Sequence, residues 1–133
     1  MRRIGLTGLL VILIAPMLCR MDRLCSDDLK REVRSPDRKY VVAAFERNCG
    51  ATTDFVQHVS LRAESAQGFK TTRDGTITDG EVFVAEGSAK VEVVWTDGAT
   101  VLVTCSGAKR VFRRDGAWGF IRINYDVRDT QIE

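Results

Sequence analysis

The sequence is poor in the residues that build metal and catalytic centres. It contains a single histidine, His58, and its four cysteines include no Cys-x-x-Cys pair. Structural zinc sites take four Cys or His ligands at short spacings, so we expect no metal. The sequence also lacks a glycine-rich phosphate loop followed by lysine, a metal-binding histidine pair and paired carboxylates at helical spacing. Without these motifs we expect no cofactor.

The chain also lacks a strong charge of either sign. Twenty Lys and Arg residues against 18 Asp and Glu residues give a formal net charge of +2. Four of the arginines precede residue 25, and the rest of the chain carries a formal charge of −1. A domain without an excess of positive charge does not bind nucleic-acid phosphates nonspecifically, so we expect no nucleic-acid partner. With 133 residues, 44% of them hydrophobic, the chain can build the core of one compact domain.

An uncharged apolar segment at residues 4–19 follows the basic start Met-Arg-Arg. This arrangement is typical of an export signal. As a helix the segment would be about 24 Å long, whereas the hydrocarbon core of a bilayer is about 30 Å thick. No clean signal-peptidase site is present, and neither Cys19 nor Cys25 follows the small residues of a lipoprotein site. We favour an uncleaved membrane anchor over a cleaved signal peptide or a degenerate lipoprotein signal.

The expected organisation is a leader over residues 1–24 and an exported domain over residues 25–133. The basic start favours a cytoplasmic N-terminus, although Arg20 and Arg23 favour the opposite orientation. The short tail before the apolar segment, and the cysteines after it, favour a body outside the cytoplasm. We therefore expect a protein bound to the bacterial cytoplasmic membrane by residues 4–19, its body facing the periplasm or the cell exterior. If the leader is cleaved, the body is secreted.

Hydrophobic patterning beyond the leader favours short β-strands. Residues 39–47 are apolar on both faces, as in a central strand covered on both sides. Further alternating segments, separated by turn signals such as Asp-Gly, predict more strands. These segments are 53–62, 81–85, 90–96, 100–105 and 118–128.

The segment before these strands is ambiguous. Residues 20–34 are compatible with a short helix capped by Ser26 or with a strand, and we favour the strand because Ser-Pro-Asp-Arg at 35–38 then forms a hairpin turn. The expected fold class is all-β: a single antiparallel sheet or sandwich of six or seven short strands. An N-terminal transmembrane helix precedes it if the leader is an anchor. The longest irregular stretch, residues 63–80, is expected to be functional or mobile.

Four cysteines behind an export signal point to an oxidising compartment. Four cysteines allow three complete pairings, but Cys19 lies at the edge of the apolar segment and is a poor candidate. Cys25 and Cys49 flank the first expected hairpin, where strand ends come close enough for a bridge. We predict a Cys25–Cys49 disulfide. Cys105 shares a strand face with two valines, so we expect it to be free and buried.

The most suggestive polar cluster is Thr52, Thr53 and Asp54, beside the predicted disulfide. With His58 these residues form a candidate binding surface at the mouth of the sheet. The alternative is that their side chains satisfy backbone N–H groups in the turn. A catalytic His58 is disfavoured, because Ser60 lies nearly 7 Å away along the same strand face. The basic run 109–114 is expected to be a solvated edge strand rather than a site for anionic lipid headgroups or an acidic partner.

Two stretches stand at a distinctive spacing from Cys25: Ser-Pro-Asp-Arg-Lys-Tyr at 35–40 and Arg-Asn-Cys-Gly-Ala-Thr-Thr at 47–53. They resemble a family of small uncharacterised bacterial cell-envelope proteins. The pattern of that family runs from a cysteine, over nine residues, to Ser-Pro-Asp-Gly-Lys and then to Arg-Asp-Cys-Gly-Ala-Thr-Thr. Arg38 stands where the family has glycine, so a turn that needs a positive φ there would be strained. Asn48 replaces the usual aspartate. The resemblance covers about residues 25–125 and implies an envelope location, but no reaction.

We expect the protein to be a non-catalytic module that binds an envelope protein or another ligand. Two other classes stay open. One is a small envelope hydrolase that uses the Thr52–Asp54 region, and the other is a structural component of the envelope.

Overall fold

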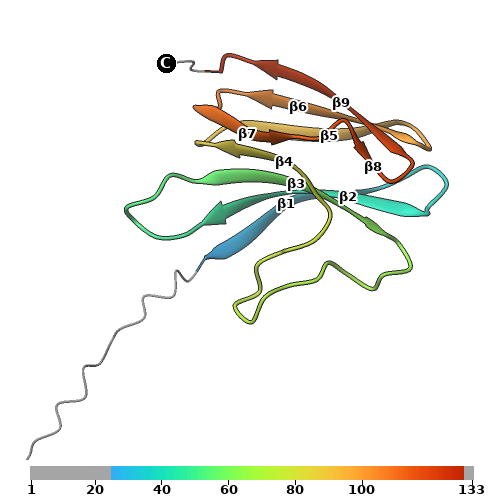
Figure 1. The fold of residues 1–133 in the computed structure, drawn as a ribbon, viewed down its shortest axis with the longest axis horizontal. Helices are drawn as coiled ribbons and strands as arrows, with labels where there is room; N and C mark the ends of the chain where they lie inside the picture. The colour runs from blue at the N-terminus through green and yellow to red at the C-terminus, as the bar shows by residue number, and fades with distance from the viewer. Residues whose placement is uncertain (1–24, 131–133) are drawn as a thin grey trace, which may run out of the picture.

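Two β-sheets pack face to face in the computed structural model, which describes residues 25–130 (Figure 1). The described residues contain nine strands and no helix, so the all-β prediction is confirmed while the expected six or seven strands were too few. The strands are β1 (Ser26–Arg34), β2 (Tyr40–Asn48), β3 (Val56–Ala63), β4 (Glu81–Glu86), β5 (Lys90–Asp97), β6 (Thr100–Ser106), β7 (Arg110–Arg114), β8 (Ala117–Trp118) and β9 (Ile121–Arg128).

The predictions for the leader lie outside the described residues. They include the anchor at residues 4–19 and the state of Cys19. Among residues 25–130, no helix is long and apolar enough to cross a membrane.

The first sheet has the order β1-β2-β3-β4-β7, and the second has the order β5-β6-β9-β8. Every pair is antiparallel except β6 and β9, which run parallel from Thr100 opposite Arg122 to Ser106 opposite Arg128. The prediction of a wholly antiparallel arrangement is therefore wrong for this pair. The reason is that the chain crosses from the second sheet to the first after β6, and β7 then runs back toward the end of the sandwich where β6 begins. There the short hairpin of β8 starts β9 in the direction of β6.

Strand β2 is buried on both faces, as its sequence predicted. Residues 41–45 are each at most 2% exposed. One face, with Val42 and Ala44, belongs to the core between the sheets. The opposite face includes Phe45, which lines a cavity together with residues of the segment between β3 and β4. This second covering comes from an irregular segment and not from a sheet.

Two side chains carry hydrogen bonds from one sheet to the other. The indole N–H of Trp95 in β5 donates to the carbonyl oxygen of Val33 in β1 at 3.0 Å. The hydroxyl of Tyr125 in β9 donates to the carbonyl oxygen of Asp115, just after β7, at 2.6 Å, and it also lies 3.1 Å from that of Val82 in β4. These contacts satisfy polar atoms at the margin of the apolar core.

One predicted strand differs in detail from the structure, and another agrees with it. The expected last strand, 118–128, is broken by Gly119, whose φ of +56° starts a tight turn between β8 and β9. The basic strand β7 lies at an edge of the first sheet, as predicted.

Residues 64–80 form the longest connection, and we call this segment the strap. Figure 1 shows it in yellow-green, crossing the face of β1–β3 that points away from the second sheet. Within these residues the backbone forms one isolated antiparallel β-bridge, between Thr71 and Ile77. The strap ends at Gly80, whose carbonyl oxygen accepts a hydrogen bond from the Leu61 N–H at 2.9 Å.

Candidate functional site

The predicted polar cluster lies in the exposed turn between β2 and β3. The backbone N–H and the hydroxyl of Thr53 both donate to the Gly50 carbonyl oxygen, at 3.2 and 3.1 Å. Asp54 forms an ion pair with Lys109, with 2.9 Å between the oxygen and Nζ. Thr52 is exposed. These contacts hold the turn together and tie it to the segment before β7.

His58 does not join the surface that these three residues share. It is 5% exposed and lies on the strap-facing side of β3, where its ring stacks on Phe45 with 5.0 Å between ring centroids. Its Nδ1 lies 2.8 Å from a carboxylate oxygen of Glu81. Burial lowers the pKa of His58, and the hydrogen bond to Glu81 opposes that effect. The imidazole is therefore neutral at pH 7, with the Nδ1 proton donated to Glu81.

The predicted disulfide between Cys25 and Cys49 is present and joins the start of β1 to the end of β2. Cys105 is free and buried, as predicted, and burial raises the pKa of its thiol. The thiol is therefore protonated at neutral pH and behaves as a small apolar side chain.

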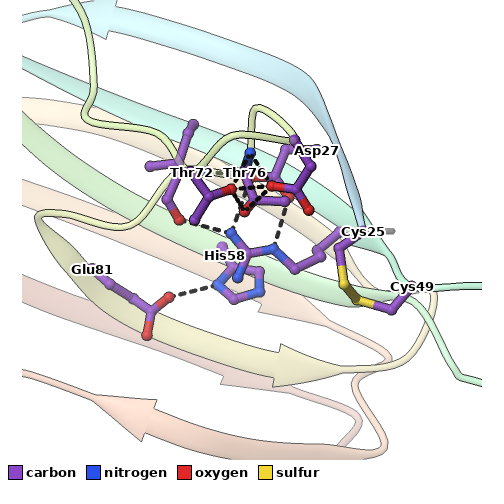
Figure 2. Close-up of polar contacts among 10 residues, drawn as sticks. Cys25, Asp27, Cys49, His58, Thr72, Thr76 and Glu81 are labelled. Carbon is purple, nitrogen blue, oxygen red and sulfur yellow. Dashed lines mark hydrogen bonds and ion pairs between the residues drawn. A yellow bond between two sulfur atoms is a disulfide. The ribbon is translucent and has the colours of Figure 1, made fainter. Parts of the chain in front are cut away.

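An ion pair lies next to the disulfide. One member follows Cys25 by two residues in β1, and the other precedes Cys49 by two residues in β2. Asp27 and Arg47 face each other across β1 and β2 with oxygen–nitrogen distances of 2.8 and 3.0 Å. The same two side chains hold the strap: Arg47 donates to the Ile77 carbonyl oxygen at 2.7 Å, and the Ile77 N–H donates to Asp27 at 2.7 Å. Figure 2 shows Asp27 and its polar contacts near the disulfide between Cys25 and Cys49. We call Asp27, Arg47 and the Ile77 backbone the clamp.

The clamp is shielded from water. The Asp27 side chain is 5% exposed and that of Arg47 is 21% exposed. Such a pair is held by its mutual attraction and by the hydrogen bonds that satisfy its remaining donors and acceptors. Interaction with Asp27 raises the pKa of Arg47 above its usual range, so the guanidinium keeps its charge.

A second set of hydrogen bonds shapes the tip of the strap (Figure 2). The hydroxyl of Thr72 bonds to the carboxylate of Asp74, and it lies 2.6 Å from the hydroxyl of Thr76. The bond from Thr72 lowers the pKa of Asp74. Gly75, with φ at +88°, allows the tight reversal between these residues.

Beneath the strap lies a cavity of about 330 Å³. Its apolar walls are Leu29 of β1, Phe45 of β2, and Phe69 and Ile77 of the strap. Its charged lining residues are already paired: Asp27 with Arg47, and Arg62 with Glu32 at 2.8 Å. The remaining lining residues are Gly68, Thr71 and Gly75.

Three buried polar atoms on the strap-facing side of β3 have no hydrogen-bond partner within the described part of the chain. They are Nε2 of His58, the hydroxyl of Ser60 and Nε of Arg62. Such atoms are costly in a protein interior, at about 1–3 kcal/mol each, and recur where a structure serves a function. Arg62 alone among these three residues lines the cavity.

His58 is not part of a nucleophile–base pair within the described residues. A nucleophile needs a base within hydrogen-bond reach, and Nε2 of His58 has no hydroxyl partner among residues 25–130. In the same residues no group of three or more His, Cys, Asp or Glu side chains is placed to hold a metal ion. A second hollow, of about 500 Å³ beside Tyr40 and Glu64, is lined by exposed and half-exposed side chains. Of these two hollows, the cavity under the strap is the better enclosed, while a smaller one of about 240 Å³ lies between β2 and the start of β5.

Sequence reasoning missed this site because its parts come from distant segments. The local signals were present: Asp27 and Arg47 each stand two residues from a bridged cysteine, and 63–80 was singled out as a long irregular stretch. Nothing in those patterns indicates that Asp27 binds the strap.

Comparisons with known proteins give a family but no activity. No curated protein and no solved structure matches the chain significantly. The model of a family of unknown function, DUF5412, matches residues 1–107, a span that includes the disulfide, the clamp and the strap. The resemblance to an uncharacterised family is confirmed at that level. Since the match covers most of its 133 residues, the chain belongs to the DUF5412 family of unknown function.

Proposed function

We propose that the protein is a non-catalytic binding module of the bacterial cell envelope and that it binds its ligand in the cavity under the strap. One observation carries the proposal. A long segment without a strand of its own is fixed by a buried clamp over a cavity. Ordering so many residues costs conformational entropy, and long ordered connections in small domains are mostly functional. Pockets with apolar walls and a few converging polar groups are typical binding sites.

The envelope location is supported by the disulfide. Disulfides persist in oxidising compartments and are rare in the cytosol. Here the Cys25–Cys49 bridge lies next to Asp27 and Arg47, so the bridge that requires an oxidising environment also braces the clamp. The apolar residues 4–19 agree with a body held at, or passed across, the cytoplasmic membrane.

The non-catalytic role is supported by the chemistry of the cavity. Its charged side chains are engaged in ion pairs, and the one imidazole of the chain is buried, neutral and bonded to Glu81. The charged side chains at the wall can position a bound molecule, but neither they nor the imidazole is a free acid, base or nucleophile.

A topology experiment tests the location. The full chain is fused at its C-terminus to alkaline phosphatase, which is active only outside the cytoplasm, and separately to green fluorescent protein, which is fluorescent when it folds in the cytoplasm. We expect phosphatase activity without fluorescence. Fluorescence without phosphatase activity would overturn the envelope location.

Native mass spectrometry tests binding. The full chain is exposed to an extract of its own envelope, repurified and weighed as wild type, as Asp27→Ala and as Asp28→Ala. Asp28 is the matched control because it is an exposed neighbour that does not contact the strap. We expect a bound small molecule on wild type and on Asp28→Ala, and its loss on Asp27→Ala. Equal binding by all three, or turnover of an envelope substrate that requires Thr52 or Asp54, would contradict the proposal.

A further inference from the structure

The second sheet has an open edge along most of β9. Its outermost strand, β8, pairs only with the start of β9, at Ile121 and Arg122 (Figure 1). The residues that precede β8 do not continue along this edge, because they form β7 of the first sheet. Within the described residues, the second sheet therefore has no strand beside residues 124–128.

The backbone of β9 points alternately toward β6 and toward this open side. The Arg122 N–H donates at 2.8 Å to the carbonyl just before β6, whereas the Ile123 N–H donates at 3.0 Å to that of Gly116, just before β8. Because successive residues of a strand direct their N–H and C=O groups to opposite sides, those of Tyr125 and Val127 point outward like those of Ile123. A strand added at the open side would pair with these two residues.

The edge strands β1, β5 and β7 carry irregularities that discourage strand addition. Each contains one residue without a partner in the neighbouring strand: Lys30 in β1, Thr96 in β5 and Phe112 in β7. Such bulges twist an edge away from a flat template. The pairing of β9 with β6, in contrast, continues without a register shift along the whole of β6. Among residues 25–130, β9 is therefore the strand that offers a regular free edge.

The open position also leaves part of the core incompletely covered. The Tyr125 ring packs against Phe83 of β4, with 5.5 Å between ring centroids. Since β9 lies over β4, the position beside β9 lies over β7, the next strand of the first sheet. Val111 of β7 and Val127 of β9 pack against the core but are only partly buried. An apolar side chain of an added strand would remove their surface from water.

Unpaired arginines surround the open edge. Arg114 lies over the Tyr125 ring, 5.1 Å from its centroid, and Arg110 reaches Glu86 only at 3.9 Å. Neither Arg114 nor Arg122 forms an ion pair within the described residues, and all three arginines are exposed. Two further arginines, one on β7 and one on β9, are already paired with aspartates. The edge therefore carries positive charge that is free to attract a carboxylate.

These charges decide which strand fits. A second copy of this chain would bring the same arginines to the interface, and like charges on neighbouring strands are destabilising. We infer that the free edge of β9 is a docking site for an extended segment of a partner protein in which apolar residues alternate with Asp or Glu. The backbone of the segment pairs with Tyr125 and Val127, its apolar side chains cover Val111, and its carboxylates pair with the exposed arginines.

This edge belongs to the second sheet, whereas the cavity under the strap lies on the first, so the docking site is independent of the proposed ligand site.

Hydrogen exchange tests the docking geometry. The probe is the end-blocked peptide Glu-Val-Glu-Val-Glu-Val-Glu, added to the full-length, oxidised protein in uncharged detergent micelles, and backbone amides are followed by NMR. In the free protein the Tyr125 and Val127 amides should exchange rapidly, and those of Asn124 and Asp126, which point toward β6, slowly. Saturating peptide should slow the first pair at least tenfold and leave the second pair unchanged. Slow exchange of Tyr125 and Val127 without peptide, or no slowing with it, would overturn the docking site.

Two matched peptides separate backbone pairing from charge. Lys-Val-Lys-Val-Lys-Val-Lys keeps the alternation but reverses the charge, and it should bind at least tenfold more weakly than the acidic peptide. The fully N-methylated acidic peptide keeps the charge but has no N–H to donate, and it should not slow the Tyr125 and Val127 amides. Equal binding of the lysine peptide would overturn the acidic partner, and equal binding of the N-methylated peptide would overturn strand addition.

Variants assign the binding to β9. Val127→Pro removes an outward N–H without breaking a bond to β6, and edge strands tolerate proline where the N–H faces solvent. Val127→Ala is its matched control, because it shortens the same side chain and keeps the N–H. We expect at least a tenfold loss of affinity for the acidic peptide with Val127→Pro and at most a threefold loss with Val127→Ala. Arg114→Ala should weaken binding about threefold, whereas Arg31→Ala, at an exposed arginine of β1, should not change it.

The same spectra show whether each variant is folded. Full affinity in a folded Val127→Pro variant would place the peptide elsewhere and overturn the docking site. If Val127→Pro does not fold, the comparison with the N-methylated peptide decides without a variant. A concentration-dependent slowing of the Tyr125 and Val127 amides in the absence of peptide would assign the edge to a second copy of the chain and overturn the acidic partner.

Discussion

The carboxylate of Asp27 accepts a 2.7 Å hydrogen bond from the backbone N–H of Ile77, fifty residues further along the chain. This contact ties the first strand to the middle of the strap. Asp27 is also the partner of Arg47, so one buried side chain serves both the sheet and the cover over the cavity. Its removal therefore has two separable consequences, one for stability and one for the strap.

We expect Asp27→Ala to lower the free energy of unfolding by about 3–5 kcal/mol, because it leaves the Arg47 guanidinium without its partner in a shielded site. Asp28→Ala removes an exposed ion pair with Lys30 and should cost no more than about 1 kcal/mol. Urea denaturation measures both values. In addition, limited proteolysis should cut within residues 64–80 of the Asp27 variant first. Equal losses for the two variants would show that the clamp contributes little.

The disulfide is expected to contribute about 3 kcal/mol, because it joins cysteines 24 residues apart in sequence. Dithiothreitol should therefore destabilise the wild type by that amount in urea denaturation. The double variant Cys25→Ala/Cys49→Ala should match the reduced wild type and should not respond to dithiothreitol. A wild type that is indifferent to reductant would mean that the bridge does not form in the folded protein.

Acid should destabilise the protein through its single histidine. Burial lowers the pKa of His58 below the ordinary value of 6.5. As the pH falls through 6.5, the unfolded chain binds a proton that the folded chain does not, so the free energy of unfolding decreases. The slope approaches, at most, about 1.4 kcal/mol per pH unit and ends at the pKa of the folded state.

The comparison of wild type with His58→Gln between pH 7.5 and 5.5 isolates this effect. The wild type should lose stability more steeply than the variant. NMR gives an independent check, since the sequence has one histidine and its imidazole signal needs no further assignment. Titration of that signal above pH 6.5 would show that the hydrogen bond to Glu81 outweighs burial.

Much of the sandwich could be predicted from local sequence patterns. The features that could not be predicted depend on contacts between distant segments. The double-faced apolar run 39–47 identified β2 as a covered strand, because burial on both faces removes the usual alternation. Cys25 and Cys49 could be paired since they flank one hairpin, whose two strands place its ends together. In contrast, the parallel pairing of β6 with β9 depends on β7 crossing to the other sheet, which no local pattern encodes.

The cavity could not be predicted for the same reason. The alternation of 53–62 places His58 and Ser60 on a polar strand face, and both side chains are buried in the structure. Contacts such as that of Asp27 with Ile77 arise from tertiary packing between segments that are far apart in the chain. The predicted surface at Thr52, Thr53 and Asp54 was selected for polar composition alone, which does not distinguish a binding surface from a turn.

Arg38 offers a test of backbone strain. Its φ of +59° lies in the left-handed region, as expected for a turn position where the resembled family has glycine. A residue with a Cβ pays roughly 1–2 kcal/mol there, and glycine does not. Arg38→Gly should therefore raise the free energy of unfolding by up to about 1 kcal/mol after the entropy cost of glycine. Lys39→Gly, at an exposed neighbour without a positive φ, should lower it. Stabilisation by neither or both would contradict the assignment of strain to Arg38.

Gly80, where the strap joins β4, is the glycine most sensitive to substitution. Its φ is +70°, and a Cβ at this position would overlap the carbonyl oxygen of Leu61. Gly75 at the strap tip is the matched control, since its φ is +88° but a Cβ there would meet nothing within 4 Å. Gly75→Ala should cost only the strain of a positive φ, about 1–2 kcal/mol. Gly80→Ala should cost at least twice as much as Gly75→Ala, because the backbone of β3 or of the strap must also move. Urea denaturation compares the two variants. Similar losses of stability would mean that Gly80 does not lie as close to the Leu61 backbone as the structure shows.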